Sequence, residues 1–383
     1  MGPVSRSQEC SSFVMESSVW SRTPGHLIER ILAFLPVEDL LRMRKVCRTW
    51  RRDILTIPSF RELHKEVSPR QQPWFLASTS KRSFLAYDMN TLKWKVLSVP
   101  ELPGKLPDPD LKVIASSQGL LCFGFRWGEL TSTEYLYVCN PITREWRHLP
   151  QHPEKTVDHF GMKFDDKTNS YKILTMNVAS SGGTIQRVTV YDSTSDQWTS
   201  GVVPNSNVHL SRAPMAWCGA SVYFMDRIQP WCELHAYDVE HSTWHEVKAT
   251  SPQVFEDPSL VACNERLFMV GLRSDCHTIW EVVHRPVGFE FMVYDDTLSA
   301  HLPNEFTEKK SQSVGRRSNM IQFRLNAVGS SNLVCFSSNL DHTWVLIYDT
   351  ESKGFHKSPK YKHAVHLSEF VDLPFHPCLD ATP

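Results

Sequence analysis

The sequence is poor in glycine and contains no long hydrophobic run. Only 16 of its 383 residues are glycine, and the longest apolar stretches, such as RLFMVGL and ILAFLP, have the length of a strand or a short helix. A helix that crosses a bilayer needs about 20 apolar residues, so we expect no membrane partner. Residues 1–18 are rich in serine and lack the apolar core of a secretory signal, and we expect a disordered tail there.

The sequence also lacks an excess of charge of either sign. It contains 41 Lys and Arg residues against 42 Asp and Glu residues, a net charge of −1. Proteins that coat nucleic acids usually carry a basic excess, so we expect no direct binding of nucleic acid. The 10 cysteines form no CxxC pair, which predicts reduced thiols and a cytoplasmic or nuclear location.

Signatures of catalysis are missing as well. The sequence has no GxSxG elbow, no phosphate-binding glycine loop and no GxGxxG after a strand. His235, His241 and His245 lie close together along the chain, but they straddle a predicted strand, a turn and the next strand. No cysteine or carboxylate completes a metal-ligand spacing around them. We therefore expect neither a metal nor another cofactor, and no enzymatic activity.

The first region with a clear pattern is helical. Between Leu27 and Leu35 apolar residues recur at i, i+3 and i+4, and Pro36 cannot continue that helix. A second apolar set, from Leu40 to Trp50, is interleaved with arginines. The pattern predicts two or three short helices. A bundle of about 40 residues has little core of its own, so we expect it to leave apolar surface for a partner to cover.

From residue 73 onward, short apolar runs alternate with polar turns, which is typical of an all-β fold. One pattern recurs as YDMNTLKW, CNPITREW, YDSTSDQW, YDVEHSTW and YDTESKGF, starting at Tyr87, Cys139, Tyr191, Tyr237 and Tyr348. The starts lie 46 to 52 residues apart, except for a last interval of 111 residues that has room for one degenerate copy. We assign that copy to Thr278–Val283 followed by Phe289, with Tyr294 and Asp295 as the alternative.

Six such units of four strands predict a six-bladed β-propeller, because one blade cannot bury both of its faces. The third unit shows the strands best, as HFGMKF, YKILTMNV, RVTVY and QWTSGVV. We interpret the recurring Tyr and Trp as scaffold side chains that pack between blades. The first unit supplies only three strands, so we expect a segment within His363–Leu373 to complete it and close the ring.

Two family resemblances follow from these motifs. Residues 23–55, TPGHLIERILAFLPVEDLLRMRKVCRTWRRDIL, resemble the F-box, with Thr23-Pro24 where that family has Leu-Pro. The β region resembles the Kelch and F-box-associated domains of plant F-box proteins, most clearly in GLLCF, NPITREWRHLP and DDKTNSYKIL. It departs from ordinary Kelch blades because Gly182-Gly183 is its only Gly-Gly doublet.

The resemblance implies a mostly β protein in which a small all-α F-box precedes a Kelch-like six-bladed β-propeller. We expect the tail over 1–18, the F-box over 19–57, a short rigid linker over 58–72 and the propeller over 73–383. By resemblance, the residues that form or support the surface docking a Skp-type adaptor are Pro24, Leu27, Ile31, Leu35, Pro36, Leu40, Val46 and Trp50. Some of them must form the core of the bundle instead, and the sequence does not divide the two sets.

Aligning the six units predicts a second surface. The loops between the second and third strands read STSKRS, FRWGEL, SSGGTIQR, DRIQPW, LRSDCH and SSNLDH, and five of the six carry an arginine. Because such loops emerge on one rim of a propeller, we predict that they bind an acidic or phosphorylated segment of a target protein. The predicted substrate-binding residues are Arg82, Arg126, Trp127, Arg187, Arg227, Trp231 and Arg273. The alternative is that arginine is simply common in exposed loops.

The function that follows is a substrate-recognition subunit of a Skp–cullin–F-box ubiquitin ligase, which brings a target protein to the ligase and performs no bond chemistry itself. One alternative is an F-box protein that acts with the adaptor outside a cullin ligase, which co-purification for a cullin would distinguish. Another is a propeller enzyme such as a copper oxidase, which a metal analysis would detect. Lys309-Lys310 and Arg316-Arg317 lie in a Ser-rich insertion that we interpret as a solvated loop, with a weak nuclear signal as the alternative.

Overall fold

The computed structural model describes residues 22–48, 50, 57–68, 71–78, 83–102, 112–127, 130–178, 184–203, 215–228, 231–250, 256–273, 276–285, 288–302, 325–338, 344–361 and 369–383. The chain divides into two compact units, residues 1–70 and residues 71–383, and each is described by itself. The predicted tail over residues 1–18, the doublet Gly182-Gly183 and the basic pairs near residues 309 and 316 lie outside the described residues.

The first unit contains the helices α2 (Gly25–Ala33), α3 (Val37–Met43) and α5 (Pro58–Val67). Prolines define where they begin: Pro24 and Pro36 are the residues before α2 and α3, and Pro58 is the first residue of α5. Proline suits these positions because its missing N–H would have no intrahelical partner there.

Helix α5 belongs to this unit and packs against α2. Its Phe60 and His64, one turn apart, are both buried, and the His64 Nε2 donates a hydrogen bond to the carbonyl oxygen of Leu35, 3.1 Å away. The predicted linker over 58–72 contains this helix, because Phe60 and His64 form a buried stripe that completes the small core of the helical unit.

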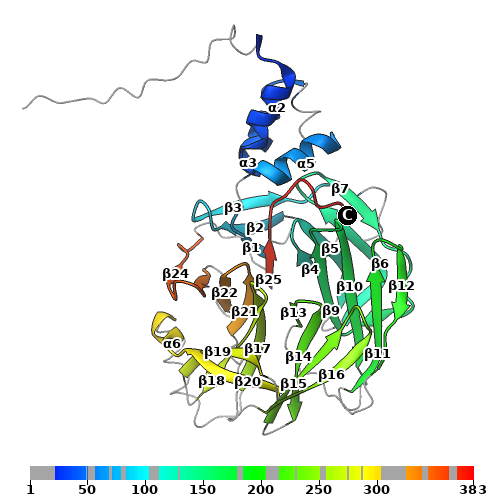
Figure 1. Cartoon of the computed structure of the whole chain (residues 1–383), viewed down its shortest axis with the longest axis vertical. Helices are drawn as coiled ribbons and strands as arrows, with labels where there is room; N and C mark the ends of the chain where they lie inside the picture. Colours follow the sequence, from blue (N-terminus) through cyan, green and yellow to red (C-terminus); the bar gives the residue numbers. More distant parts are fainter. Residues whose placement is uncertain are drawn as a thin grey trace, which may run out of the picture. The chain divides into compact units, whose positions relative to one another are not determined.

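The second unit consists of six antiparallel sheets, which we number as blades 1 to 6 (Figure 1). Blade 1 contains β25 (Glu369–Phe375), β1 (Trp74–Ser78), β2 (Ser83–Asp88) and β3 (Lys93–Ser98). Blade 2 contains β4 (Lys112–Ser117), β5 (Leu120–Trp127), β6 (Leu130–Asn140) and β7 (Glu145–His148), with β8 (Thr156–Val157) also paired to β6. Blade 3 contains β9 (His159–Asp165), β10 (Ser170–Val178), β11 (Ile185–Asp192) and β12 (Gln197–Ser200).

The remaining blades continue in chain order. Blade 4 contains β13 (Ala216–Cys218), β14 (Ser221–Ile228), β15 (Trp231–Asp238) and β16 (Thr243–Thr250); blade 5 contains β17 (Glu256–Cys263), β18 (Arg266–Arg273), β19 (Cys276–Arg285) and β20 (Gly288–Asp295), followed by the short helix α6 (Leu298–His301); blade 6 contains β21 (Leu325–Ser330), β22 (Leu333–Ser338), β23 (Leu346–Asp349) and β24 (Phe355–Lys357).

The first strands of the blades form a closed inner ring. In ring order β25, β4, β9, β13, β17 and β21 each contact the next, and β21 contacts β25 again. The ring closes through β25, the strand nearest the C-terminus, which pairs with β1 in antiparallel register. The segment that completes the first blade is Glu369–Phe375, which overlaps the predicted His363–Leu373 and runs past it to Phe375. The six-bladed propeller is confirmed.

The predicted repeat corresponds to one turn geometry between the third and fourth strands. In each of the five clear copies an Asp or Asn side chain accepts a hydrogen bond of 2.8 or 2.9 Å from the backbone N–H two residues later. The residue four positions after it has a positive φ, between 52° and 69°. These residues are Asp88 with Leu92, Asn140 with Arg144, Asp192 with Asp196, Asp238 with Ser242, and Asp349 with Lys353. The second residue of each clear copy is Asp or Asn because its side chain closes the turn.

The two segments assigned to the degenerate copy both lie in blade 5. Thr278–Val283 is part of β19, the third strand, and Phe289 is the second residue of β20, where it is opposite His284. In the five clear copies the aromatic residue is opposite the first residue of the copy, so the register of this copy stays a prediction. Tyr294 and Asp295 end the fourth strand instead, so they are not the counterpart of the Tyr-Asp pair in the other blades.

The recurring aromatic residues join neighbouring blades, as predicted. Within a blade, Tyr and Trp of one copy have ring centroids about 5 Å apart, for example 5.1 Å for Tyr191 and Trp198. Between blades, the indole N–H of the Trp donates to a backbone carbonyl that follows the preceding blade. These bonds are Trp94 to Pro359 at 2.7 Å, Trp198 to Pro150 at 2.9 Å and Trp244 to Val202 at 2.7 Å.

Candidate docking face and propeller rim

The helical unit has an exposed apolar face. On α2, Leu27, Ile31 and Phe34 are 44%, 49% and 52% exposed, and Val46 after α3 is 62% exposed. Leu27, Ile31 and Phe34 follow one another at i, i+4 and i+7, so they lie along one side of the helix. We call Leu27, Ile31, Phe34 and Val46 the apolar docking face.

The structure divides the predicted adaptor-binding set into exposed, buried and half-buried residues. Leu27, Ile31 and Val46 lie on the apolar docking face, and Pro24 beside them is exposed. Leu40 is fully buried with Leu32, Ala33 and Val37 in the core. Leu35, Pro36 and Trp50 are half-buried. Phe34 was missed, although its spacing of three residues from Ile31 was the signal that could have found it.

The predicted propeller loops occupy equivalent positions in all six blades. Each of them joins the second strand of a blade to the third: β1 to β2, β5 to β6, β10 to β11, β14 to β15, β18 to β19 and β22 to β23. Because the first strands form a closed ring and neighbouring strands are antiparallel, these six connections leave the ring at the same end. We call this end the second-to-third-strand rim.

The structure describes the side chain of only one of the predicted rim residues. Arg187, on β11, forms an ion pair with Glu154 in the segment between blades 2 and 3. The backbones of Arg126, Trp127, Arg227, Trp231 and Arg273 lie at the ends of β5, β14, β15 and β18, but their side chains, like the whole of Arg82, lie outside the described part. Arg187 is thus already neutralised within the chain.

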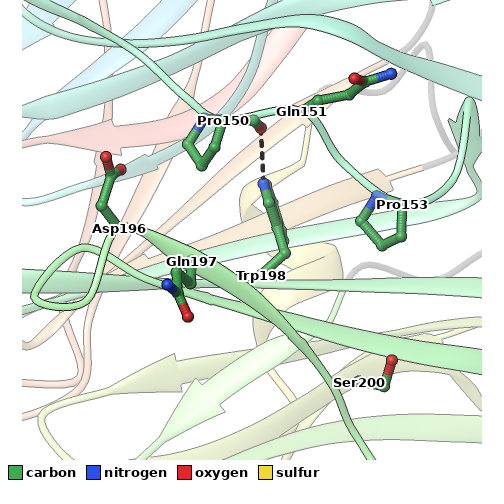
Figure 2. A pocket seen from close by; sticks show the side chains of 7 residues that line it. All are labelled: Pro150, Gln151, Pro153, Asp196, Gln197, Trp198 and Ser200. Atoms are coloured by element: carbon green, nitrogen blue, oxygen red, sulfur yellow. Dashed lines mark hydrogen bonds between the residues drawn. The ribbon is translucent and has the colours of Figure 1, made fainter.

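A surface depression of about 350 Å³ lies at the joint between blades 2 and 3 (Figure 2). It is lined by Pro150, Gln151, Pro153, Asp196, Gln197, Trp198 and Ser200. Its polar groups are engaged within the protein: the Trp198 indole donates to Pro150, and Asp196 binds Arg147 at 3.0 Å and accepts from the Tyr191 hydroxyl at 2.7 Å. Burial and that bond raise the pKa of Tyr191. We interpret this depression as a structural joint.

The histidines considered as metal ligands are separated. His235 is buried against Phe224, His241 in the turn pairs with Asp238 at 3.0 Å, and His245 is exposed on β16. No group of three or more His, Cys, Asp or Glu within the described ranges could hold a metal ion. None of the helices described is long and apolar enough to cross a membrane.

Comparison with known families agrees with the architecture. The profile of the F-box domain matches residues 20–52, and that of the F-box associated beta propeller domain matches residues 87–248. The chain is therefore an F-box protein with an F-box-associated β-propeller domain.

Its homologues are plant F-box and F-box/kelch-repeat proteins. F-box only protein 6 of Arabidopsis thaliana is 30% identical over 289 residues, which are 70% of this chain and 57% of that protein. F-box/kelch-repeat protein At5g43190 of the same plant is 31% identical over 189 residues, 48% of this chain and 44% of the relative. SKP1-interacting partner 15, also from Arabidopsis thaliana, is 25% identical over 259 residues, 60% of this chain and 64% of the relative. Each match spans less than two thirds of the relative's length.

Proposed function

We propose that this protein is the substrate-recognition subunit of a Skp–cullin–F-box ubiquitin ligase. The observation that carries the proposal is the apolar docking face, which sits on a unit identified as an F-box. Four large apolar side chains there are 44% to 62% exposed, and fully burying such a side chain contributes roughly 1.5–3 kcal/mol. The similarity to a protein named for its interaction with SKP1 supports a Skp-type adaptor as the partner.

Binding of the adaptor is tested by changing the docking face alone. The double variant Leu27→Glu/Ile31→Glu should reduce binding of a purified Skp-type adaptor at least 100-fold, because it places two carboxylates against an apolar partner surface. Both side chains are 44% exposed or more, so the thermal unfolding midpoint of the propeller should not change.

His26→Glu is the matched control, because His26 is exposed on the same helix and stands at neither i, i+3 nor i, i+4 from Leu27, Ile31 or Phe34. It should leave adaptor binding within twofold of the parent. Undiminished binding by the double variant would contradict the proposal. Leu35 and Pro36 are less suitable positions, because both are half-buried and the Leu35 carbonyl accepts the hydrogen bond from His64. Substitutions there would affect folding of the helical unit as well as adaptor binding.

The propeller would bind the target, and we propose an acidic or phosphorylated segment as the recognised feature. The supporting observations are the arginines in five of the six loops and the common end of the ring from which these loops leave. Targets can be collected by proximity labelling under proteasome inhibition, with a chain that lacks the F-box as the trap. Arg126→Glu/Arg227→Glu should then reduce target capture, whereas Arg187→Gln should not, because Arg187 is already paired with Glu154.

In this role the protein contributes proximity: it raises the effective concentration of target lysines near the conjugating enzyme. Co-purification of a cullin with the full chain is the observation that separates a ligase subunit from an F-box protein that acts with the adaptor alone.

A further inference from the structure

The chain continues beyond β25 as a tail, His376–Pro383, that leaves blade 1 and binds three other blades. The His376 backbone N–H donates to the Gln118 carbonyl in blade 2 at 2.9 Å, and its ring Nε2 is hydrogen-bonded to the Ser330 hydroxyl in blade 6 at 2.5 Å. Further along, Asn169 of blade 3 donates to the Thr382 hydroxyl at 3.0 Å. The tail therefore connects blades 6, 1, 2 and 3, which are consecutive in the ring.

The tail is ordered and bends at Leu379 and Asp380. Phe375, Pro377, Leu379 and Ala381 are buried, and the residues between them are partly exposed. Because of the bend, the carbonyl oxygens of Cys378 and Ala381 both lie within hydrogen-bond distance of one side-chain nitrogen, that of Asn140. The tail is therefore held by hydrogen bonds to its main chain together with burial of its apolar side chains.

Gly119 allows the close approach of the tail. A Cβ at Gly119 would lie 2.3 Å from the Cys378 Sγ and 3.2 Å from the His376 carbonyl oxygen. Any larger residue at this turn would displace the tail, so the surface is shaped for the segment that covers it.

Asn140 provides the specific contact, and it is the one departure from Asp among the five clear copies of the repeat. Its Oδ1 closes the turn by accepting the N–H of Ile142 at 2.9 Å, as the aspartates do elsewhere. Its Nδ2 donates to the carbonyl oxygens of Cys378 at 3.1 Å and Ala381 at 2.9 Å. A carboxylate has no N–H to donate, so capture of the tail explains why this copy has Asn.

We propose that Gln118, Gly119, Asn140 and Asn169 form a peptide-binding site on blades 2 and 3, which recognises a bent segment through its main chain and which His376–Pro383 occupies in the same molecule. This site shares no residue with the docking face and does not depend on the proposed ligase function. Its ligand class is a short peptide that can bend so that two of its carbonyl oxygens converge on the Asn140 side chain.

The first test separates the tail from its site. A chain ending at Phe375 keeps β25 and should bind the synthetic peptide HPCLDATP, measured by isothermal titration calorimetry, whereas the full chain should not. Asn140→Asp in the shortened chain should weaken binding of the peptide at least tenfold. Asp192→Asn, at the equivalent turn of blade 3, is the matched control and should leave binding unchanged. A folded shortened chain that does not bind the peptide would overturn the proposal, as would equal binding by the Asn140→Asp variant.

The second test uses the full chain, so it does not depend on folding of the shortened one. Peptide-resolved mass spectrometry measures alkylation of Cys378, whose thiol has a pKa raised by burial. Asn140→Asp and Gly119→Ala should each accelerate its alkylation at least tenfold, while Cys335, buried in blade 6, stays slow and Asp192→Asn changes neither. If the Asn140→Asp chain reacts at Cys378 no faster than the parent, Asn140 does not hold the tail and the site does not exist.

Discussion

Single side chains hold neighbouring blades together in this propeller. The indole N–H of Trp94, Trp198 and Trp244 each spans a blade junction to reach a carbonyl of the preceding blade. The equivalent Trp146 is half-buried, and its Nε1 is buried without a hydrogen-bond partner among the described residues. Tryptophans at equivalent positions of different blades therefore occur both with and without this hydrogen bond.

This difference yields a matched pair of variants. Trp198→Phe should lower the free energy of unfolding by about 1 kcal/mol more than Trp146→Phe, because a hydrogen bond contributes roughly that amount and its loss strands the carbonyl. Both changes remove the same atoms, so the loss of packing is similar in the two variants. Urea unfolding followed by tryptophan fluorescence measures the difference. Equal destabilisation of the two variants would mean that the indole hydrogen bond contributes nothing to the free energy of unfolding.

His376, whose ring is hydrogen-bonded to Ser330, makes stability depend on pH. Burial lowers its pKa from 6.5 to about 4, so the neutral ring is favoured in the fold. Its contribution is fully present above pH 6.5 and is lost as the pH falls toward 4, since the unfolded chain takes up a proton first. The difference between these two pKa values corresponds to about 3 kcal/mol of folding free energy. Burial also lowers the pKa of His152 and His159, which acts in the same direction.

Thermal unfolding between pH 7 and pH 4 measures this dependence. His376→Gln keeps a hydrogen-bonding side chain beside Ser330 and removes the titration, so its unfolding midpoint should fall less steeply with acid than that of the parent. Parallel curves for the two proteins would show that His376 does not titrate in this range.

At the scale of elements, the turn between the third and fourth strands is the unit that repeats. The residue four positions after the Asp or Asn of this turn has a positive φ. In blade 1 that residue is Leu92, whose φ is 53° and which is 45% exposed. A left-handed conformation costs an ordinary residue roughly 1 kcal/mol. Leu92→Gly should therefore raise the free energy of unfolding by about 0.5–1 kcal/mol, measured by denaturant titration. A loss of stability would mean that the Leu92 side chain contributes more than its backbone strain costs.

Helix α5 shows how an element can differ from its sequence assignment. The segment is short and begins with Pro58, which suggested a linker, yet Phe60 and His64 are buried against the end of α2. The unit identified as an F-box therefore has a third helix in its core.

At the scale of the whole molecule, the C-terminal strand closes the ring. Deleting Tyr361–Pro383 removes β25 and exposes the edges of β1 and of the inner strands β4 and β21 beside it, so the unfolding midpoint should drop by many degrees and unfolding should lose its cooperativity. Deleting only His376–Pro383 retains β25 and should cost much less. Differential scanning calorimetry compares the two chains, and an unchanged midpoint for the longer deletion would contradict the closure by β25.

The sequence by itself determined the class of the fold, the number of blades and the closure of the ring. These features are local and repeated: each copy has its own Asp or Asn to close a turn and its own aromatic residue seven positions from its first residue. A pattern that recurs every 46 to 52 residues can be read without knowing any long-range contact. The alternating apolar pairs and prolines of the F-box are likewise a local pattern, which can be recognised without knowing any long-range contact.

Only the tertiary structure decided which side chains are available to partners. It separated exposed Leu27 and Ile31 from buried Leu40, it paired Arg187 with Glu154, and it brought Asn140 to the carbonyl of Ala381, which is 241 positions away along the chain. The physical reason is that a helical stripe shows only which residues share a side, whereas exposure depends on what packs against that side. The contact between Asn140 and the tail arises only once all six blades are in place, so no local pattern could predict it.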